Sequence, residues 1–210
     1  MKNLLLLFVM SIGCLSATKA QIKLPKNLGG SKTITIDHIP STTDEFIQMR
    51  DRMAKTPEGG AAIFVLATIK YTQDPEMGRH WVIIATDPYW LSSSSAGRAY
   101  KGFDLGNSAN FSLQQTDSKK YIPYSYIKGT SAANGYQPGN TPYKISIERS
   151  TDAGDGMIKI FVQTSGADTA RPITMNKNSA GIWKGFEYSS IFVGVKQPIV
   201  KSKGAAGGDF

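Results

Sequence analysis

The sequence predicts an α+β fold, with N-terminal helices packed on one face of a C-terminal antiparallel sheet. Between Ser41 and Asp87, apolar residues recur at helical spacing behind three N-cap signals. After residue 142 the period of the apolar residues changes to two, and turn residues separate the alternating segments. With 210 residues, the chain is long enough for one domain with its own core.

The first elements of the domain are a strand and a helix. Residues 33–37, TITID, alternate between apolar and polar side chains and predict a short strand. The segment STTDEF then begins the first helix, which places Phe46, Met49 and Met53 at helical spacing. Two capping boxes are possible at its start, Ser41 with Asp44 or Thr42 with Glu45.

Two further helices follow, beginning at Pro57 and at Pro75. Each has an N-cap residue, proline at the first helical position, and an acid near the positive end of the helix dipole. The helix from Pro57 is apolar nearly all round from Ala61 to Ile69. It is therefore expected to be the buried central helix. The segment DPYW ends the helix from Pro75.

The rest of the chain is irregular at first and then strand-forming. Residues 88–143 carry many Gly, Ser and Asn residues, with one short helix expected in NSANFSLQQ. Four alternating segments follow and predict an antiparallel meander. They are YKISIERS (143–150), GMIKIFVQTSG (156–166), RPITMNKN (171–178) and GIWKGFEYSSIFVGV (181–195).

The two ends of the chain predict export. Residues 1–20 have a charged start, an apolar run and small residues before Gln21, as in a secretory signal peptide. We therefore expect a periplasmic or extracellular protein with a flexible leader (21–32), a single domain (33–198) and a disordered tail (199–210). In an alternative interpretation, SIGC is a lipobox and a lipid on Cys14 anchors the protein. No apolar run is long enough to predict a transmembrane helix.

The charge pattern bears on the partners. The formal net charge is +8, but the lysines are scattered rather than clustered in a stripe. Nucleic-acid binding is therefore not expected. A small molecule, a glycan or an envelope protein is the expected partner, and the sequence predicts no oligomeric state.

Four separated blocks resemble an uncharacterised bacterial domain family that carries only a domain-of-unknown-function label. The blocks are TPEGGAAIFVLATIKYTQDPEMG, YIKGTSAANGY, SGADTARPITM and IWKGFEYSSIFVGV. The resemblance implies a bacterial source and a fold, but no activity. The order of the elements is also similar to the cone-shaped cystatin-like and nuclear-transport-factor-like superfold, a likeness of shape alone.

Catalytic signals are weak in this sequence. The two histidines, His38 and His80, show no metal-binding spacing, and no Gly-x-Ser-x-Gly elbow is present. Neither a cofactor nor a metal is expected, and a non-enzymatic binding domain is the leading hypothesis. The alternative is a small hydrolase that acts on envelope glycans through two carboxylates, and the candidate acids are Asp104, Asp168 and Glu187.

The candidate ligand site lies in the tyrosine-rich part of the chain. Six of its nine tyrosines fall between residues 100 and 143, and the stretch YIKGTSAANGY could present stacking rings and anion-binding donors. The same stretch could instead be an Ω-like loop that Tyr126 and Tyr136 fasten to the sheet. Asp168 is expected to cap a turn and to pair with Arg171. The candidate site residues are Tyr126, Gly129, Thr130, Ser131, Asn134, Tyr136, Asp168 and Arg171.

Overall fold

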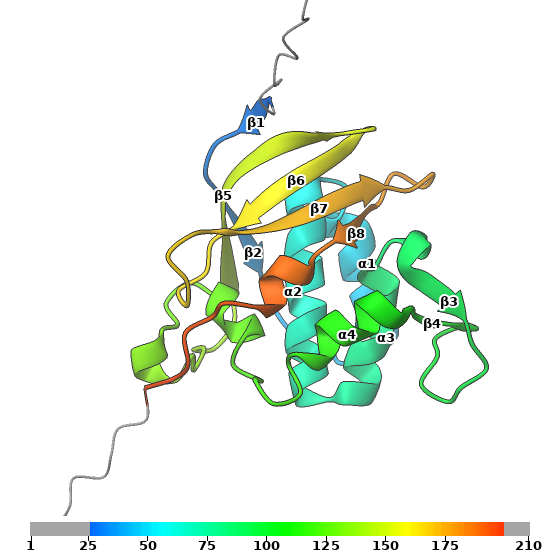
Figure 1. Ribbon diagram of the computed structural model, residues 1–210, viewed down its shortest axis with the longest axis horizontal. Coiled ribbons are helices and arrows are strands. Elements are labelled where there is room, and N and C mark those ends of the chain that lie inside the picture. Colours follow the sequence, from blue (N-terminus) through cyan, green and yellow to red (C-terminus); the bar gives the residue numbers. More distant parts are fainter. Residues whose placement is uncertain (1–25, 200–210) are drawn as a thin grey trace, which may run out of the picture.

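A computed structural model describes residues 26–199 of the protein and confirms the α+β class (Figure 1). The predicted signal peptide, Cys14 and nearly all of the predicted tail lie outside the described residues. The helices of the described part are α1 (Thr43–Met53), α2 (Pro57–Gln73), α3 (Pro75–Ala85) and α4 (Asn107–Gln114). None of these helices is long and apolar enough to cross a membrane.

A six-stranded sheet covers the helices. Its order is β1-β5-β6-β7-β8, and β2 pairs with the same edge of β5 as β1 does. All these pairings are antiparallel, and β5 to β8 form the predicted meander. The strands are β1 (Asn27–Gly29), β2 (Lys32–Ile36), β5 (Tyr143–Gly154), β6 (Met157–Val162), β7 (Arg171–Lys177) and β8 (Trp183–Glu187). A separate hairpin pairs β3 (Leu91–Ser93) with β4 (Phe103–Leu105).

Helix α2 is the buried central helix that the sequence predicts. Its N-cap residue Thr56 accepts a hydrogen bond at Oγ1 from the N–H of Gly59, 3.1 Å away. Asp74 ends α2 and caps α3, since its carboxylate accepts from the N–H of Met77 at 3.2 Å. At the first helix, Thr42 is the residue that caps, and it accepts from the N–H of Glu45.

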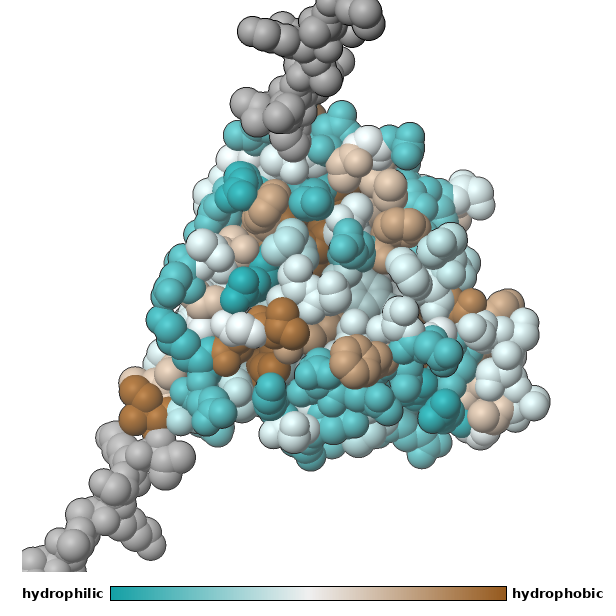
Figure 2. Space-filling view, in the orientation of Figure 1, coloured by the Kyte–Doolittle hydropathy of each residue, from teal (hydrophilic) through white to brown (hydrophobic). Residues whose placement is uncertain are grey.

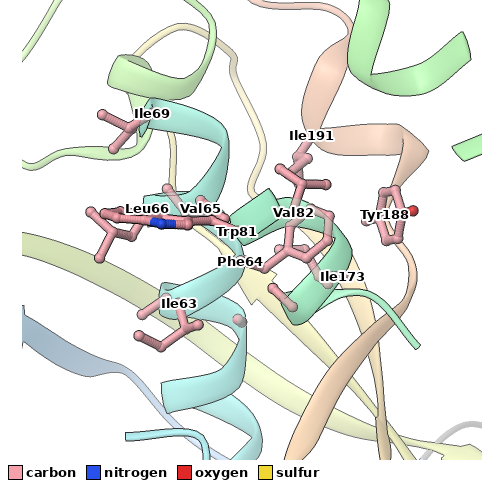
Figure 3. Packing of buried hydrophobic residues seen from close by; sticks show 14 of the residues in the cluster. Ile63, Phe64, Val65, Leu66, Ile69, Trp81, Val82, Ile173, Tyr188 and Ile191 are labelled. Carbon is pink, nitrogen blue, oxygen red and sulfur yellow. The ribbon is translucent and has the colours of Figure 1, made fainter. Parts of the chain in front are cut away.

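The core lies between α2, α3 and the inner face of the sheet (Figure 3). The side chains of α2 meet those of α3 on one side and those of the sheet and the C-terminal segment on the other. Trp81 of α3 is fully buried and stacks on Phe46 of α1, with ring centroids 4.4 Å apart. The labelled residues of Figure 3 are Ile63, Phe64, Val65, Leu66, Ile69, Trp81, Val82, Ile173, Tyr188 and Ile191.

The structure differs from the sequence predictions in several segments. Within the part of the chain expected to be irregular, residues 91–93 and 103–105 pair as the β3–β4 hairpin. Residues 27–29, expected in a flexible leader, form β1, because the exposed edge of β5 supplies backbone hydrogen bonds that no side-chain pattern reveals. Residues 189–192, expected to continue the last strand, form the 3₁₀ turn η4 (Ser189–Phe192). Here the buried residues Tyr188, Ile191 and Phe192 recur at helical spacing, and the period of two ends at Glu187.

Candidate functional site

A polar pocket lies on the outer face of the sheet, opposite the helices. Along β5, Ile145 and Ile147 are buried in the core, so that Ser146 and Glu148 lie on the other face. Two segments, residues 125–129 and 163–170, flank these side chains. Together they enclose an open pocket of about 450 Å³.

The lining of this pocket is rich in hydrogen-bonding groups. Lys128 contributes a positive charge, and Glu148 and Asp168 contribute negative charges. The remaining polar side chains are uncharged, and most are hydroxyls. They are Ser31, Thr33, Ser125, Ser146, Gln163, Thr164, Ser165 and Thr169.

Backbone hydrogen bonds fix the flanking segments to the sheet and to each other. The N–H of Lys128 donates to the carbonyl of Lys144 at 2.8 Å. The N–H of Ser165 donates to the carbonyl of Ser125 at 2.9 Å, and Thr164 Oγ1 lies 2.7 Å from Ser125 Oγ. The pocket is therefore formed by ordered backbone before any ligand arrives.

The structure brings three of the eight candidate residues to this pocket, namely Tyr126, Gly129 and Asp168. Gly129 has φ +94°, a left-handed conformation that favours glycine. Thr130 lies behind the wall, where its Oγ1 is 2.8 Å from the carbonyl of Ile127 and 3.1 Å from Ser165 Oγ. Thr130 thus supports the pocket but does not line it.

Ser131 and Asn134 have a local structural role. They form a capping box around the 3₁₀ turn η3 (Ala132–Asn134), in which Ser131 Oγ accepts from the N–H of Asn134 and the side-chain Oδ1 of Asn134 accepts from the N–H of Ser131. Gly135 ends this turn at φ +67°, as expected for the Asn-Gly pair. Their hydrogen bonds are thus used to shape the loop.

The two tyrosines of the predicted stacking site are buried. Tyr126 and Tyr136 are 2% and 1% exposed, and burial raises the pKa of both. The hydroxyl of Tyr126 donates to the carbonyl of Ile191 at 2.8 Å, and that of Tyr136 donates to the carbonyl of Lys196 at 2.7 Å. Although each residue borders a pocket, its ring has almost no free surface on which a ligand could stack, and the two hydroxyls fasten the C-terminal segment rather than the sheet.

The expected ion pair between Asp168 and Arg171 is not the one observed. Asp168 pairs with Lys196 at 2.7 Å, and this hydrogen bond holds the pKa of the Asp168 carboxyl below its ordinary value. Arg171 instead donates from a terminal guanidinium nitrogen to the carbonyl of Gly194 at 3.0 Å. The sequence prediction failed because Lys196 is distant in sequence and comes close only when the C-terminal segment folds back.

Four tyrosines of the tyrosine-rich segment line another pocket, of about 380 Å³; they are Tyr121, Tyr124, Tyr136 and Tyr143. Its members Tyr121 and Tyr136 stack with centroids 5.5 Å apart, and Tyr124 accepts a hydrogen bond at its hydroxyl from the side-chain amide of Gln73. The tyrosine enrichment therefore serves mainly to pack this corner of the domain.

The three carboxylates of the hydrolase hypothesis lie in three different places. Asp104 is buried, which by itself raises its pKa, but the carboxylate accepts hydrogen bonds from Arg79, Arg98 and the N–H of Leu105, and together these hold the pKa below its ordinary value. Asp168 lines the polar pocket, and Glu187 lines a separate groove beside Trp90. The carboxylate that does share a pocket with Asp168 is Glu148, which pairs with its neighbour Arg149.

The histidines do not share a site. His38 is exposed just after β2, whereas His80 lies on α3 next to the ring of Tyr100. Within residues 26–199, no three His, Cys, Asp or Glu side chains are grouped so as to hold a metal ion.

Sequence reasoning did not select most of the residues that line the polar pocket, among them Ser31, Thr33, Ser146, Glu148 and Gln163. The alternation of the strands predicts that Thr33, Ser146 and Glu148 face away from the core. That signal identifies an outward face. It does not reveal that two distant loops flank one part of this face and form a pocket there.

The fold and the pocket define an α+β domain with a preformed polar cavity on the outer face of its sheet. The chain belongs to the family described as a domain of unknown function (DUF6935), whose model matches residues 38–199. No significant match was found among curated proteins or among solved structures.

Proposed function

We propose that this protein is an exported, non-enzymatic domain that binds a hydroxyl-rich ligand, an oligosaccharide of the cell envelope, in the polar pocket. The observation that carries the proposal is the set of uncommitted hydrogen-bonding side chains there. Among residues 26–199, the side chains of Ser31, Thr33, Ser146, Gln163 and Thr169 line the pocket without a hydrogen-bond partner.

The chemistry of these groups favours a sugar. Hydroxyl side chains both donate and accept, and the Gln163 amide offers two donors and an acceptor, which matches the mixed donor and acceptor character of a sugar hydroxyl. Lys128, Glu148 and Asp168 nearly balance in charge, so the pocket is not built for a strongly charged ligand. The volume of the pocket, about 450 Å³, is also suitable, because small-molecule sites in proteins are typically about 300–1,000 Å³.

The fixed backbone around the pocket also supports binding. The two flanking segments are fixed by backbone hydrogen bonds, such as that from Lys128 to Lys144 and that from Gln163 to Ser146, both 2.8 Å. A ligand would therefore order few side chains on entry, which reduces the entropic cost of binding.

The electrostatics favour binding over catalysis. A glycosidase of the usual kind needs a carboxylic acid whose pKa is raised so that it can donate a proton. Lys196 does the opposite to Asp168 and holds its pKa low, while Glu148 pairs with Arg149. The alternative remains a hydrolase that uses Asp168 and Glu148, because both line the same pocket.

The test is a glycan and peptidoglycan-fragment array, followed by isothermal titration calorimetry with any oligosaccharide that binds. Thr33→Val removes one hydroxyl at nearly constant shape, and Gln163→Leu removes the amide. Each should weaken binding about 2- to 10-fold, the value of one hydrogen bond. Thr35→Val is the matched control, since Thr35 is exposed on the same face of β2 but does not line the pocket.

Two results would count against this proposal. One is an array without any binding, or binding that Thr33→Val and Thr35→Val affect equally. The other is hydrolysis of the bound oligosaccharide that is lost in Asp168→Asn, which would favour the enzyme. Export is tested separately by N-terminal sequencing of the protein from the envelope fraction, where a chain that begins at Gln21 is expected.

A further inference from the structure

Another pocket differs from the polar pocket in its lining, because it combines apolar walls with positive charges. It has a volume of about 360 Å³ and lies where α1, α3, the β3–β4 hairpin and β8 meet. The walls are formed chiefly by Ile47, Ile83 and Phe103, and the charged groups are Arg50, Lys101 and Lys184. No carboxylate lines it among the described residues.

Lys184 is the most unusual of these cations. Its ammonium group is partly buried and donates to the carbonyl of Ile84, near the end of α3, at 2.6 Å. It forms no ion pair with any carboxylate of residues 26–199, although Asp51 and Asp87 are close enough to act on it electrostatically. Burial and the neighbouring Arg50 lower the pKa of Lys184 to about 8.

The positive charges of Arg50 and Lys101 are also only partly matched by neighbouring groups. The Arg50 side chain is 15% exposed and forms an ion pair with the adjacent Asp51, but its Nε, 2.8 Å from that carboxylate, is buried without a well-aligned hydrogen bond. Lys101 is exposed, with its ammonium 5.5 Å from the centre of the Tyr100 ring. An added anion would therefore gain attraction from three cations and would stabilise the charged form of the partly buried Lys184 amine.

We propose that this pocket binds an amphiphilic anion, a single carboxylate on an apolar chain, with the headgroup against Lys184, Arg50 and Lys101 and the chain along Ile47, Ile83 and Phe103. The apolar walls select the chain, since Phe103 is 49% exposed and would be covered by it. The charges select the headgroup, because three positive groups and no lining acid complement one negative charge. This inference is independent of the polar pocket.

Octanoate is the probe, with octanol as its neutral counterpart. In calorimetry or protein NMR at pH 7, octanoate should bind at least about tenfold more tightly than octanol. Lys184→Met keeps the length of the side chain and removes its charge, and should weaken octanoate binding at least about tenfold. Lys101→Gln is a safer variant for folding, because Lys101 is exposed, and should weaken binding about 2- to 5-fold.

The control is Lys177→Gln, an exposed lysine on β7 that does not line the pocket, and it should leave binding unchanged. Binding should also depend on pH. If the headgroup needs the protonated form of Lys184, the affinity falls about tenfold between pH 7 and pH 9, and this fall is absent in Lys184→Met. The charged or titratable groups around Lys184 are Arg50 and Asp51 from α1, Asp87 after α3, and Tyr100 and Lys101 from the segment that joins β3 and β4. His80 of α3 lies next to the ring of Tyr100.

The proposal would be overturned if octanoate did not bind, or if octanol bound equally well. It would equally fail if Lys184→Met and Lys101→Gln both bound octanoate as the wild type does. Chemical shift changes confined to residues outside α1, α3, the hairpin and β8 would also refute it, because they would place the probe elsewhere.

Discussion

Gly78→Ala should destabilise the protein although alanine is the better helix former. Gly78 lies on α3 where this helix crosses α2, and a Cβ atom there would come within 2.2 Å of the backbone N and Cα of Tyr71. Carbon atoms prefer separations of about 3.5–4.0 Å, so the helices would have to separate by more than about 1 Å. Gly in a helix costs about 1 kcal/mol relative to Ala, which sets the size of the opposing gain.

The loss should exceed this gain. Overpacking alone costs about 1–3 kcal/mol, and separation of the helices would also loosen the packing around Trp81, which is fully buried. We expect a net loss of about 2 kcal/mol in the free energy of unfolding. Urea titration followed by tryptophan fluorescence measures it.

Gly30→Ala is the control for this experiment. A Cβ at Gly30 would meet nothing within 4 Å, and this substitution should change the free energy of unfolding by less than about 0.5 kcal/mol. Equal or higher stability of Gly78→Ala would show that α2 and α3 tolerate a wider separation. The close backbone contact would then not be what fixes the helix pair.

Three further predictions concern buried polar groups. Asp104→Asn should lower the free energy of unfolding by about 3–5 kcal/mol in urea titration at pH 7, because the Arg79 side chain, 8% exposed, loses its charged partner. Since the folded-state pKa of Asp104 is lowered, the wild-type excess over this variant should begin to shrink as the pH falls below about 4 and should be lost once the pH passes the lower folded-state pKa; no excess at pH 7 would contradict the assignment. Lys184 has a folded-state pKa of about 8 against 10.5 ordinarily, so between these pH values the unfolded chain binds more protons than the folded one. The free energy of unfolding should therefore rise by up to about 3 kcal/mol from pH 8 to 10.5. Lys184→Met should show a flatter dependence of this free energy on pH, and identical dependences would refute the burial of this amine. Tyr126→Phe should lower the thermal midpoint through a loss of about 1–2 kcal/mol, because the carbonyl of Ile191 loses its donor; an unchanged midpoint would mean that water replaces the hydroxyl.

The sequence was a good guide wherever a local signal decides the structure. The caps at Thr56 and Asp74, and the proline that follows each, determine where α2 and α3 begin, and the structure confirms both. The change to a period of two after residue 142 likewise predicted the meander from β5 to β8. These signals work because capping and the alternation of side chains depend on neighbours in the sequence.

Prediction failed where distant segments decide. The pairing of Asp168 with Lys196 depends on the path of the C-terminal segment, which Tyr126 and Tyr136 fasten through backbone carbonyls. A carbonyl acceptor has no sequence signature, because every residue carries one. The tyrosines therefore looked like ligand-binding residues when their rings are in fact buried.

The candidate pockets show the same limit in a more useful form. Thr33 and Ser146 could be assigned to an outward face, and Lys184 to an alternating strand, but their surroundings come from loops and helices that are remote in sequence. In both pockets the informative feature is a polar group that the fold leaves partly unmatched. In the polar pocket these are hydroxyls that bond no other described group. In the other pocket it is the Lys184 ammonium, which donates to one carbonyl but pairs with no carboxylate of residues 26–199. A ligand that supplies the missing partner gains most at such groups. The polar pocket and the pocket around Lys184 are therefore proposed to bind different ligands, because the fold leaves a different kind of partner missing in each.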